Sequence, residues 1–418
     1  MSGDKGNDMP SRREILRHLP LLPIAAQIGG CATEDSAMQE RIVRDIVAWD
    51  TIEDHRTGTE GDARTAEWLA DAIRTAGLEP DVVRFPFERR VLNECRITVG
   101  GRSADGVPLF DGAYTGARGW QAPLHPLADG TGIGVTEFAP SPAAPSTAEL
   151  LAARRNGRHA AIVAVAAGES VLPGLALLNA NDYRAPFGPP VLQVATEHGP
   201  WLEAAVAERA LAEFIAHVTL ENTKAANVQT RITGRDPSLA PLVIMTPRSA
   251  WWTCTSERAG GISVWLESLR HFATRRPERT VIFTANTGHE LGHVGLDHYL
   301  ASDGALIEAA HAWIHLGANF AARGSQVLFQ ASSQKLLTEG LAAFDALGQK
   351  PDRITPLSSR PLGEARNIYD GGGRFVSILG DNRWFHHPDD RWPVSVDVER
   401  TVLLTRAMLN IAKQLAGG

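Results

Sequence analysis

The sequence predicts an α/β protein with a mixed, mostly parallel sheet that carries helices on both faces. From Ala226 onward, short apolar runs typical of buried strands alternate with segments whose apolar residues have helical spacing. Glycine and other turn-forming residues separate these segments, as expected at the ends of strands and helices. Strands are expected at 227–232, 242–246, 280–285, 312–316 and 374–379, and helices at 261–274, 295–302, 334–346 and 398–415.

A change of composition indicates an inserted domain in the first half of the chain. Between residues 100 and 222 Gly, Pro and Ala dominate, and buried-strand patterns occur at 158–165 and 188–194. We therefore expect residues 37–99 and 223–418 to form one main domain. The segment 100–222 is expected to be a lid-like, β-rich insert within it.

The overall composition is that of an ordinary soluble globular protein. The 418 residues are 44% hydrophobic and 21% charged. The net charge of -7 provides no basic surface for nucleic acid, so nucleic-acid binding is not expected. Between residue 40 and the end of the chain, no stretch approaches the roughly 20 apolar residues of a membrane span.

The N-terminus has the pattern of an export signal. Arg12 and Arg13 are followed by an apolar residue and a leucine at the offsets of a twin-arginine signal. The apolar segment 19–28 ends in two glycines and Cys31, which resembles a lipoprotein-processing site. We expect residues 1–36 to be a leader, the protein to be periplasmic or anchored to the cell envelope, and Cys31 to be lipidated. A disordered basic N-terminus is the alternative.

An H-E-x-x-H motif begins at His289. On a helix it is a zinc-protease signature, because two histidines one turn apart hold the metal and the glutamate activates water. Here the motif follows the strand-like run 280–285, and Gly292 and Gly295 are unfavourable inside a helix. We therefore expect the motif at the C-terminal end of a strand, where α/β sheets place their ligands, and not on a metal-bearing helix.

Three segments at expected strand ends carry side chains that bind metals. Glu257 stands just before the first turn of an expected helix, and Glu290 follows the strand 280–285. His386 lies in a loop beyond the last expected strand. Two carboxylates and one imidazole, with water in the fourth position, would form an open catalytic zinc site.

These segments resemble the zinc aminopeptidases (family 28 metallopeptidases), a family that includes glutamate carboxypeptidases and glutaminyl cyclases. Residues 257–261 are similar to the family's D-N-A-S-G motif, residues 289–295 to E-E-x-G-L-x-G, and residues 385–390 to Y-H-T-P-x-D. The resemblance extends over about residues 40–415. It implies an aminopeptidase fold, in which the segment 100–222 is a protease-associated (PA) domain.

The resemblance implies at most one zinc ion. Family members hold two zinc ions bridged by the aspartate that corresponds to Glu257, and the first zinc would be bound by Glu257, Glu290 and His386. The second zinc needs a histidine and an aspartate where this sequence has Pro247 and Gly317. Neither residue offers a side-chain ligand, and the glutaminyl cyclases are a precedent for a single zinc.

The resemblance also suggests roles for residues near the expected zinc. His289 corresponds to the family's general base, and an imidazole can accept a proton near neutral pH. Trp251 and Trp252 could wall a substrate pocket or pack beneath the insert. Arg248 or Arg258 could orient a substrate carboxylate, or one of them could replace the charge of the missing second zinc.

The sequence thus predicts an exported hydrolase that cleaves an amide or peptide-type bond, with one zinc and His289 as the base. Ordinary aminopeptidase activity is not expected, since the second metal helps to hold the free amine and the water. Two alternatives remain open. One is a metal-free binding protein of the cell envelope, and the other is a metal-independent hydrolase or lyase that uses His289, Glu290 and Glu257.

Overall fold

A computed structural model describes residues 34–141, 144–168 and 171–417. The chain divides into two compact units, residues 1–37 and 38–418, and the fold below is that of the second. Cys31 and almost all of the predicted leader lie outside the described residues, so export and lipidation stay predictions.

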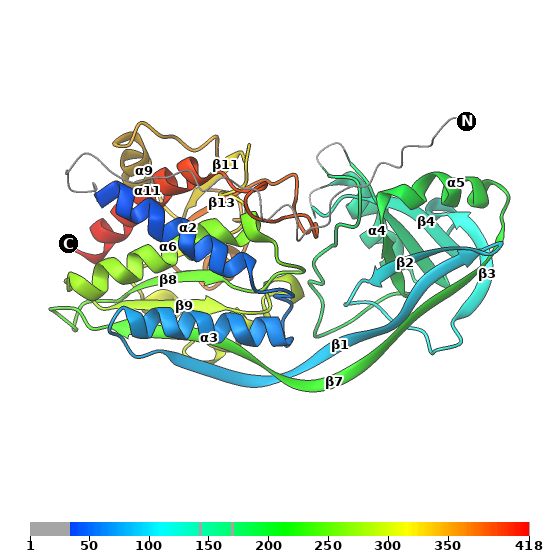
Figure 1. The fold of residues 1–418 in the computed structure, drawn as a ribbon, viewed down its shortest axis with the longest axis horizontal. Coiled ribbons are helices and arrows are strands. Elements are labelled where there is room, and N and C mark those ends of the chain that lie inside the picture. Colours follow the sequence, from blue (N-terminus) through cyan, green and yellow to red (C-terminus); the bar gives the residue numbers. More distant parts are fainter. Residues whose placement is uncertain (1–33, 142–143, 169–170, 418) are drawn as a thin grey trace, which may run out of the picture. The chain divides into compact units, whose positions relative to one another are not determined.

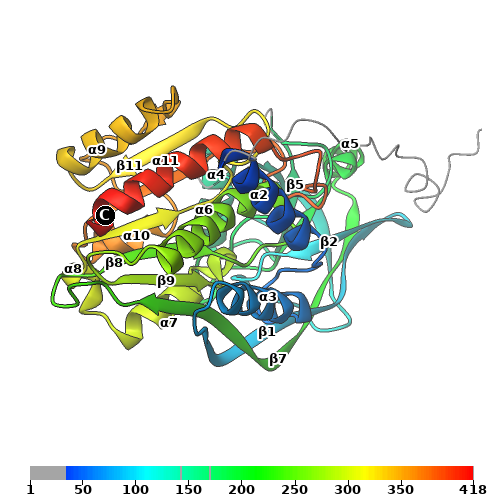
Figure 2. The ribbon, with the colours of Figure 1, turned by 60° about the vertical axis from the view of Figure 1, so that its left-hand side comes forward.

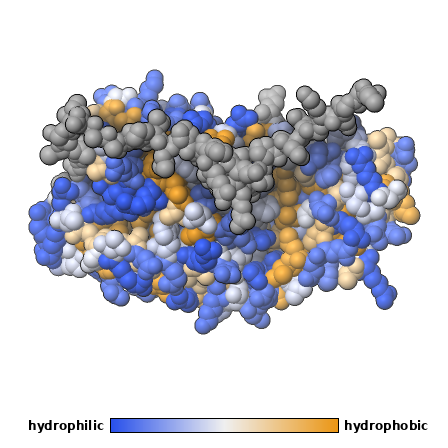
Figure 3. Space-filling view, viewed as in Figure 1, coloured by the Kyte–Doolittle hydropathy of each residue, from blue (hydrophilic) through white to orange (hydrophobic). Residues whose placement is uncertain are grey.

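Figure 3 shows one face of the described part of the chain. Within this part of the chain, no helix is both long enough and apolar enough to span a membrane. The face drawn in Figure 3 mixes hydrophilic residues with scattered hydrophobic ones, which is usual for a protein surface.

A mixed sheet lies at the centre of the main domain (Figure 1). Its strands are β7 (Leu211–Ile232), β8 (Leu242–Pro247), β9 (Val281–Asn286), β10 (Ala312–Leu316), β11 (Val327–Ala331), β12 (Arg353–Ile354) and β13 (Phe375–Gly380). In the order β9-β8-β10-β13 neighbouring strands are parallel, whereas β7 and β11 pair antiparallel at either side. The predicted fold class is confirmed. Parallel strands are buried on both faces, so their sequences are continuous apolar runs that can be recognised.

Helices cover both faces of this sheet (Figure 2). One face carries α3 (Glu60–Thr75), α6 (Thr255–Thr274), α9 (Gln334–Asp345) and α11 (Val398–Ala416), which share a core with Leu242 and Ile244. The other face carries α7 (Val294–Ser302), α8 (Leu306–Ala309) and α10 (Ala365–Asp370), which pack with Val243 and Met245. Successive residues of β8 thus face opposite layers, as the pleat of a strand requires. Helix α2 (Glu34–Asp50) is joined to α6 by an ion pair between Arg41 and Glu267.

Two long antiparallel strands, β1 (Asp81–Val99) and β7, lead from the main sheet into the inserted domain (Figure 1). The insert contains β2 (Arg102–Pro108), β3 (Trp120–Pro126), β4 (Ile133–Phe138), β5 (Ala161–Ala166), β6 (Val191–Val194), α4 (Pro145–Asn156) and α5 (Gly199–Ala207). The predicted boundary after residue 222 therefore falls inside β7. The interpretation of this insert as a PA domain stays a prediction.

A buried histidine, His55, packs against Trp49 near the end of α2. His55 stacks on Trp49 with 3.9 Å between ring centroids, and its Nδ1 is 2.8 Å from Thr65 Oγ1. Burial removes the ring from water and lowers the pKa of His55 to about 3. The folded protein therefore keeps this ring neutral at pH values where an exposed imidazole takes up a proton.

We expect His55 to make the protein less stable in acid. Below the ordinary pKa of 6.5 the unfolded chain binds a proton that the folded chain refuses until about pH 3. Stability is thus complete above pH 6.5 and falls as the pH decreases, by about 1.4 kcal/mol per pH unit for this group. Urea unfolding of His55→Gln between pH 7 and 5 should show a shallower pH slope than the wild type. The partly exposed His198, replaced by Gln, is the matched control, and equal slopes for His55→Gln and the wild type would contradict the prediction.

Candidate functional site

The candidate site lies where the loops after β8, β9, β10 and β13 meet. These four strands are parallel, so their carboxyl ends lie at the same edge of the sheet. The connection after β8 leads into α6, which carries Glu257 and Arg258, and the connection after β9 carries His289 and Glu290. His386 comes from the loop after β13. All five side chains are buried.

The H-E-x-x-H segment does not form an α-helix. His289–Leu291 is a single 3₁₀ turn, and the next two residues have left-handed backbone, with φ of 71° at Gly292 and 63° at His293. Helix α7 begins only at Val294. The expectation that this motif does not lie on an α-helix is therefore confirmed.

Asp390 determines where α6 begins. Its Oδ1 accepts a hydrogen bond from the backbone N–H of Ser256 at 2.9 Å, and its Oδ2 accepts one from the N–H of Glu257 at 3.0 Å. These bonds satisfy two of the N–H groups that a helix leaves free at its start. The helix begins at Thr255 instead of the predicted Gly261. Glu257 thus lies in the first turn and not before it, which corrects the prediction.

Arg258 lies between the two carboxylates that were predicted to bind zinc. Its Nη2 donates a hydrogen bond to Glu290 Oε1 and is 2.9 Å from Glu257 Oε1. Its Nε donates to the carbonyl oxygen of Ser249 at 2.6 Å, and Ser249 Oγ donates to Glu290 Oε2 at 2.6 Å. One guanidinium group is therefore the counterion of two buried carboxylates. Both oxygens of Glu290 accept hydrogen bonds.

Glu257 and His386 face each other beside this arginine. His386 Nδ1 donates to the carbonyl oxygen of Leu177 at 2.5 Å, which leaves the lone pair on Nε2, 3.6 Å from Glu257 Oε1. Among the described residues, neither His386 Nε2 nor either Glu257 oxygen has a hydrogen-bond partner. Arg258 thus neutralises Glu257 by proximity, without a well-directed hydrogen bond. Burial would raise the pKa of Glu257, but the charge of Arg258 outweighs it and lowers this pKa.

The predicted zinc ligands do not fit a zinc ion in this arrangement. In the described part of the chain, the donor atoms of Glu257, Glu290 and His386 do not all lie within 4.8 Å of one another. An ion bound to both carboxylates would also lie close to Arg258 Nη2, which contacts the same oxygens. A dication and a monocation 4 Å apart repel by about 8 kcal/mol at an effective dielectric constant of about 20. The single zinc site therefore stays a prediction, and the position of Arg258 does not favour it.

A different group of donors does converge within the described residues. Ligand atoms of Cys254, Glu257 and Asp390 lie within 4.8 Å of one another. Both oxygens of Asp390 already accept the backbone N–H groups at the start of α6. Burial also raises the pKa of Cys254, so its thiol keeps its proton. Asp390 therefore serves to cap α6, and these contacts do not favour Cys254, Glu257 and Asp390 as a metal site.

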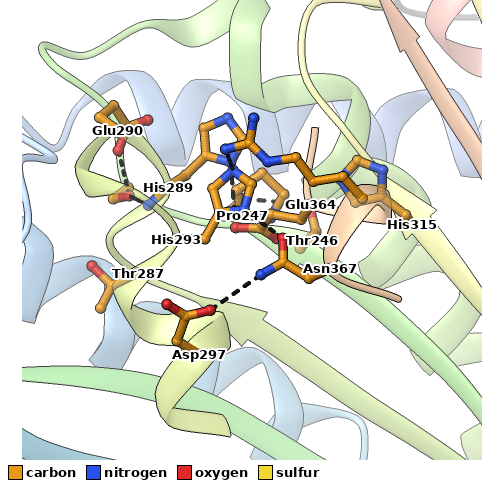
Figure 4. A network of polar contacts seen from close by, with 12 residues as sticks. Thr246, Pro247, Thr287, His289, Glu290, His293, Asp297, His315, Glu364 and Asn367 are labelled. Carbon is orange, nitrogen blue, oxygen red and sulfur yellow. Dashed lines mark hydrogen bonds and ion pairs between the residues drawn. The ribbon is translucent and has the colours of Figure 1, made fainter. Parts of the chain in front are cut away.

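A second polar network, which sequence analysis missed, holds His289 (Figure 4). His289 Nδ1 is 3.3 Å from Glu364 Oε1, a fully buried carboxylate just before α10. Beside it, His293 Nδ1 is 2.7 Å from Asn367 Oδ1, and Arg366 Nη2 is 3.2 Å from His293 Nε2. Glu364 belongs to no recognisable motif and is 75 residues from His289 in sequence, so no sequence signal pointed to it.

Burial keeps His289 in its neutral form. Burial, helped by the charge of Arg258, lowers the pKa of His289 to about 3. At neutral pH the ring can therefore donate Nδ1–H to Glu364 and keep a lone pair on Nε2. A neutral imidazole held in one orientation offers its Nε2 lone pair to a proton, although the lowered pKa makes it a weaker base than an exposed imidazole.

Residues 171–184 of the inserted domain, the covering segment, lie over these loops. The N–H of Ala180 donates to the carbonyl oxygen of Glu290 at 2.8 Å. His387 Nε2 is 3.1 Å from the carbonyl oxygen of Pro173. Together with the bond from His386 to Leu177, these contacts join the covering segment to the loops after both β9 and β13.

Arg248 has contacts of a structural residue. Its side chain is fully buried, and its Nη1 is 2.9 Å from Asp62 Oδ1 and 2.8 Å from the carbonyl oxygen of Asp62. Its Nη2 donates to the carbonyl oxygen of Ala226. The substrate-binding role predicted for Arg248 stays a prediction, and these contacts do not favour it.

The two tryptophans have different surroundings. Trp251 is buried in the hydrophobic core of the insert, and the centroid of its ring lies 5.3 Å from that of Phe110. Trp252 is only partly buried, and its Nε1 donates to the carbonyl oxygen of His386 at 3.0 Å. Trp252 therefore contacts the backbone of a predicted site residue.

Solved structures match this chain over almost its whole length, although no family model and no curated protein matches its sequence. A zinc aminopeptidase from Bacillus subtilis has 16% identity and a TM-score of 0.71, over 91% of this chain and 94% of that one. An aminopeptidase from Aneurinibacillus sp. strain AM-1 has 14% identity and a TM-score of 0.68, over 90% and 94%. A peptidase M28 precursor from Shewanella amazonensis has 13% identity and a TM-score of 0.68, over 92% and 98%. At such identities the likeness shows the fold, and the predicted family-28 metallopeptidase fold is confirmed.

Proposed function

We propose that this protein hydrolyses amide or peptide-type bonds in small molecules or peptides, and that it does so without a metal ion. The fold shared with aminopeptidases supports the class of reaction. The observation that carries the proposal is geometric: Glu364 holds His289 through Nδ1, and Arg258 contacts both Glu257 and Glu290, where a metal would otherwise bind. Export from the cytoplasm, indicated by Arg12 and Arg13, remains part of the proposal.

In the proposed reaction, a water oxygen attacks the carbonyl carbon while His289 Nε2 takes one of its protons. Arg258 Nη1, which has no hydrogen-bond partner among the described residues, stabilises the oxyanion. The carbon–nitrogen bond then breaks, and His289 returns the proton to the leaving nitrogen. The products are a carboxylic acid and an amine. Glu364 is a positioning residue, because it acts only through the orientation of His289.

The single-zinc hydrolase expected from the sequence would use the same fold with a different charge arrangement. Arg258 would first have to move away from Glu257 and Glu290 before these carboxylates could bind the metal. The metal-free route needs no such change, and for this reason we favour it.

The proposal is tested with N-acyl amino acids, amino-acid anilides and short peptides as substrates, in the presence of EDTA. We expect hydrolysis that chelation does not diminish, and a loss of about 10²–10⁴ in kcat/KM for His289→Asn. Glu364→Gln should lower kcat more than it raises KM, and Glu364→Asp should recover part of the loss. The distant His311→Gln serves as the control and should leave the rate unchanged.

Two results would contradict the proposal. Hydrolysis that EDTA abolishes and zinc restores would establish a metal-dependent enzyme. If none of these substrates is turned over but calorimetry detects binding of one of them, the protein is a binding protein on a hydrolase fold.

A further inference from the structure

We infer that Arg258 takes the place of the metal ion of this fold, so that the native chain binds no zinc at Glu257 and Glu290. We further infer that shortening this one side chain creates a zinc site. The inference concerns metal binding alone, so the amount of bound zinc tests it and no activity measurement is needed.

The position of the guanidinium is the first reason. Arg258 Nη2 contacts one oxygen of Glu257 and one oxygen of Glu290, the two carboxylates that the zinc would need. Arg258 follows Glu257 directly in the first turn of α6, so the same helix start that presents the carboxylate also presents its counterion. All three side chains are buried, so this cation is not free to move into solvent.

The unused donor atoms nearby are the second reason. His386 Nε2 and both oxygens of Glu257 are buried and without hydrogen-bond partners in the described part of the chain. Removal of the guanidinium also frees Glu290 Oε1. Two carboxylates and one imidazole would then border the vacated space, and once these side chains move closer together they form a donor set that zinc accepts.

Arg270 provides a matched control within the same fold. Its Nη1 is 2.6 Å from Asp45 Oδ2 and 2.8 Å from Glu267 Oε1, so it too lies between two carboxylates. No histidine contributes to the hydrogen bonds and ion pairs of Arg270 among the described residues. Removing Arg270 should therefore leave two carboxylates without the third ligand, and Arg41 would still pair with one of them, Glu267.

The experiment measures zinc by mass spectrometry after each purified protein has been incubated with zinc sulfate and then dialysed. We expect the wild type and Arg270→Ala to retain almost no zinc, and Arg258→Ala to retain about one ion per chain. Arg258→Ala combined with Glu290→Gln or with His386→Ala should lose it again. Added zinc should raise the melting temperature of Arg258→Ala but not that of the wild type.

Each other outcome overturns the inference. Wild type that retains about one zinc, lost on Glu290→Gln and His386→Ala, would show that the arginine gives way to the metal. If the wild type binds zinc and the Cys254→Ser variant does not, the metal binds at the start of α6 instead. Folded Arg258→Ala that binds no more zinc than Arg270→Ala would show that the freed donors do not form a site. If Arg258→Ala does not fold, the zinc content of the wild type still tests whether the native chain binds zinc. Arg258→Gly, refolded with zinc present, then tests whether a shorter side chain creates a zinc site.

Discussion

Replacing Arg258 with methionine is expected to lower the free energy of unfolding by about 3–5 kcal/mol. Methionine keeps most of the length of the side chain but leaves Glu257 and Glu290 buried without their counterion. An uncompensated buried carboxylate must either remain charged at a high cost or take up a proton. The loss should therefore be largest at neutral pH and become smaller as the pH falls towards the ordinary carboxyl pKa.

A double-mutant cycle measures this effect by urea unfolding. Glu290→Gln, alone and together with Arg258→Met, removes one of the two charges that the arginine balances. We expect the double variant to be more stable than the sum of the two single effects predicts, by on the order of 1–3 kcal/mol. Additive losses would mean that the arginine stabilises the fold by packing and not by charge.

Gly292→Ala is expected to be strongly destabilising. A Cβ at this position would lie 2.3 Å from the carbonyl oxygen of Asn181 in the covering segment. The backbone also has φ of 71°, which costs a non-glycine residue about 1–2 kcal/mol by itself. Relief of the clash must displace the covering segment, so the total loss of stability should reach about 3 kcal/mol or more.

Gly324→Ala separates the two causes. Gly324 has nearly the same backbone, with φ of 77°, but nothing lies within 4 Å of its Cβ position. We expect Gly324→Ala to lose only the stability that the left-handed backbone costs a non-glycine residue. In Gly292→Ala, but not in Gly324→Ala, the amide of Ala180 should exchange its hydrogen at least about tenfold faster, because its bond to Glu290 is strained. Equal effects of the two variants on stability and on exchange would contradict this account.

The fold could be predicted because its central strands are apolar throughout and short. The segment 242–246, for example, has the composition of a strand buried on both faces, and it forms β8. The start of α6 was less predictable, because the residue that caps it, Asp390, is 134 positions away from Ser256. Local sequence patterns carry no information about a partner at that distance.

The candidate site shows the same limit in its chemistry. The sequence identified Glu257, Glu290 and His386 as polar residues at strand ends, and the structure brings them to one edge of the sheet. It did not reveal that Arg258 would lie between the two carboxylates, because residue types do not determine which pairs form. Glu364 escaped notice for the opposite reason, since nothing in its neighbourhood resembles a functional motif.

The hydrogen bonds of Asp390 have a consequence for the order in which the protein folds. The first turn of α6 needs a carboxylate that ribosomes add 134 residues after Ser256. Until that segment has been synthesised, two N–H groups at the helix start lack their partner, and Glu257 lacks a fixed position. The edge of the sheet that carries the candidate site therefore completes late, after the strands beneath it, and contacts this distant in sequence slow the final step.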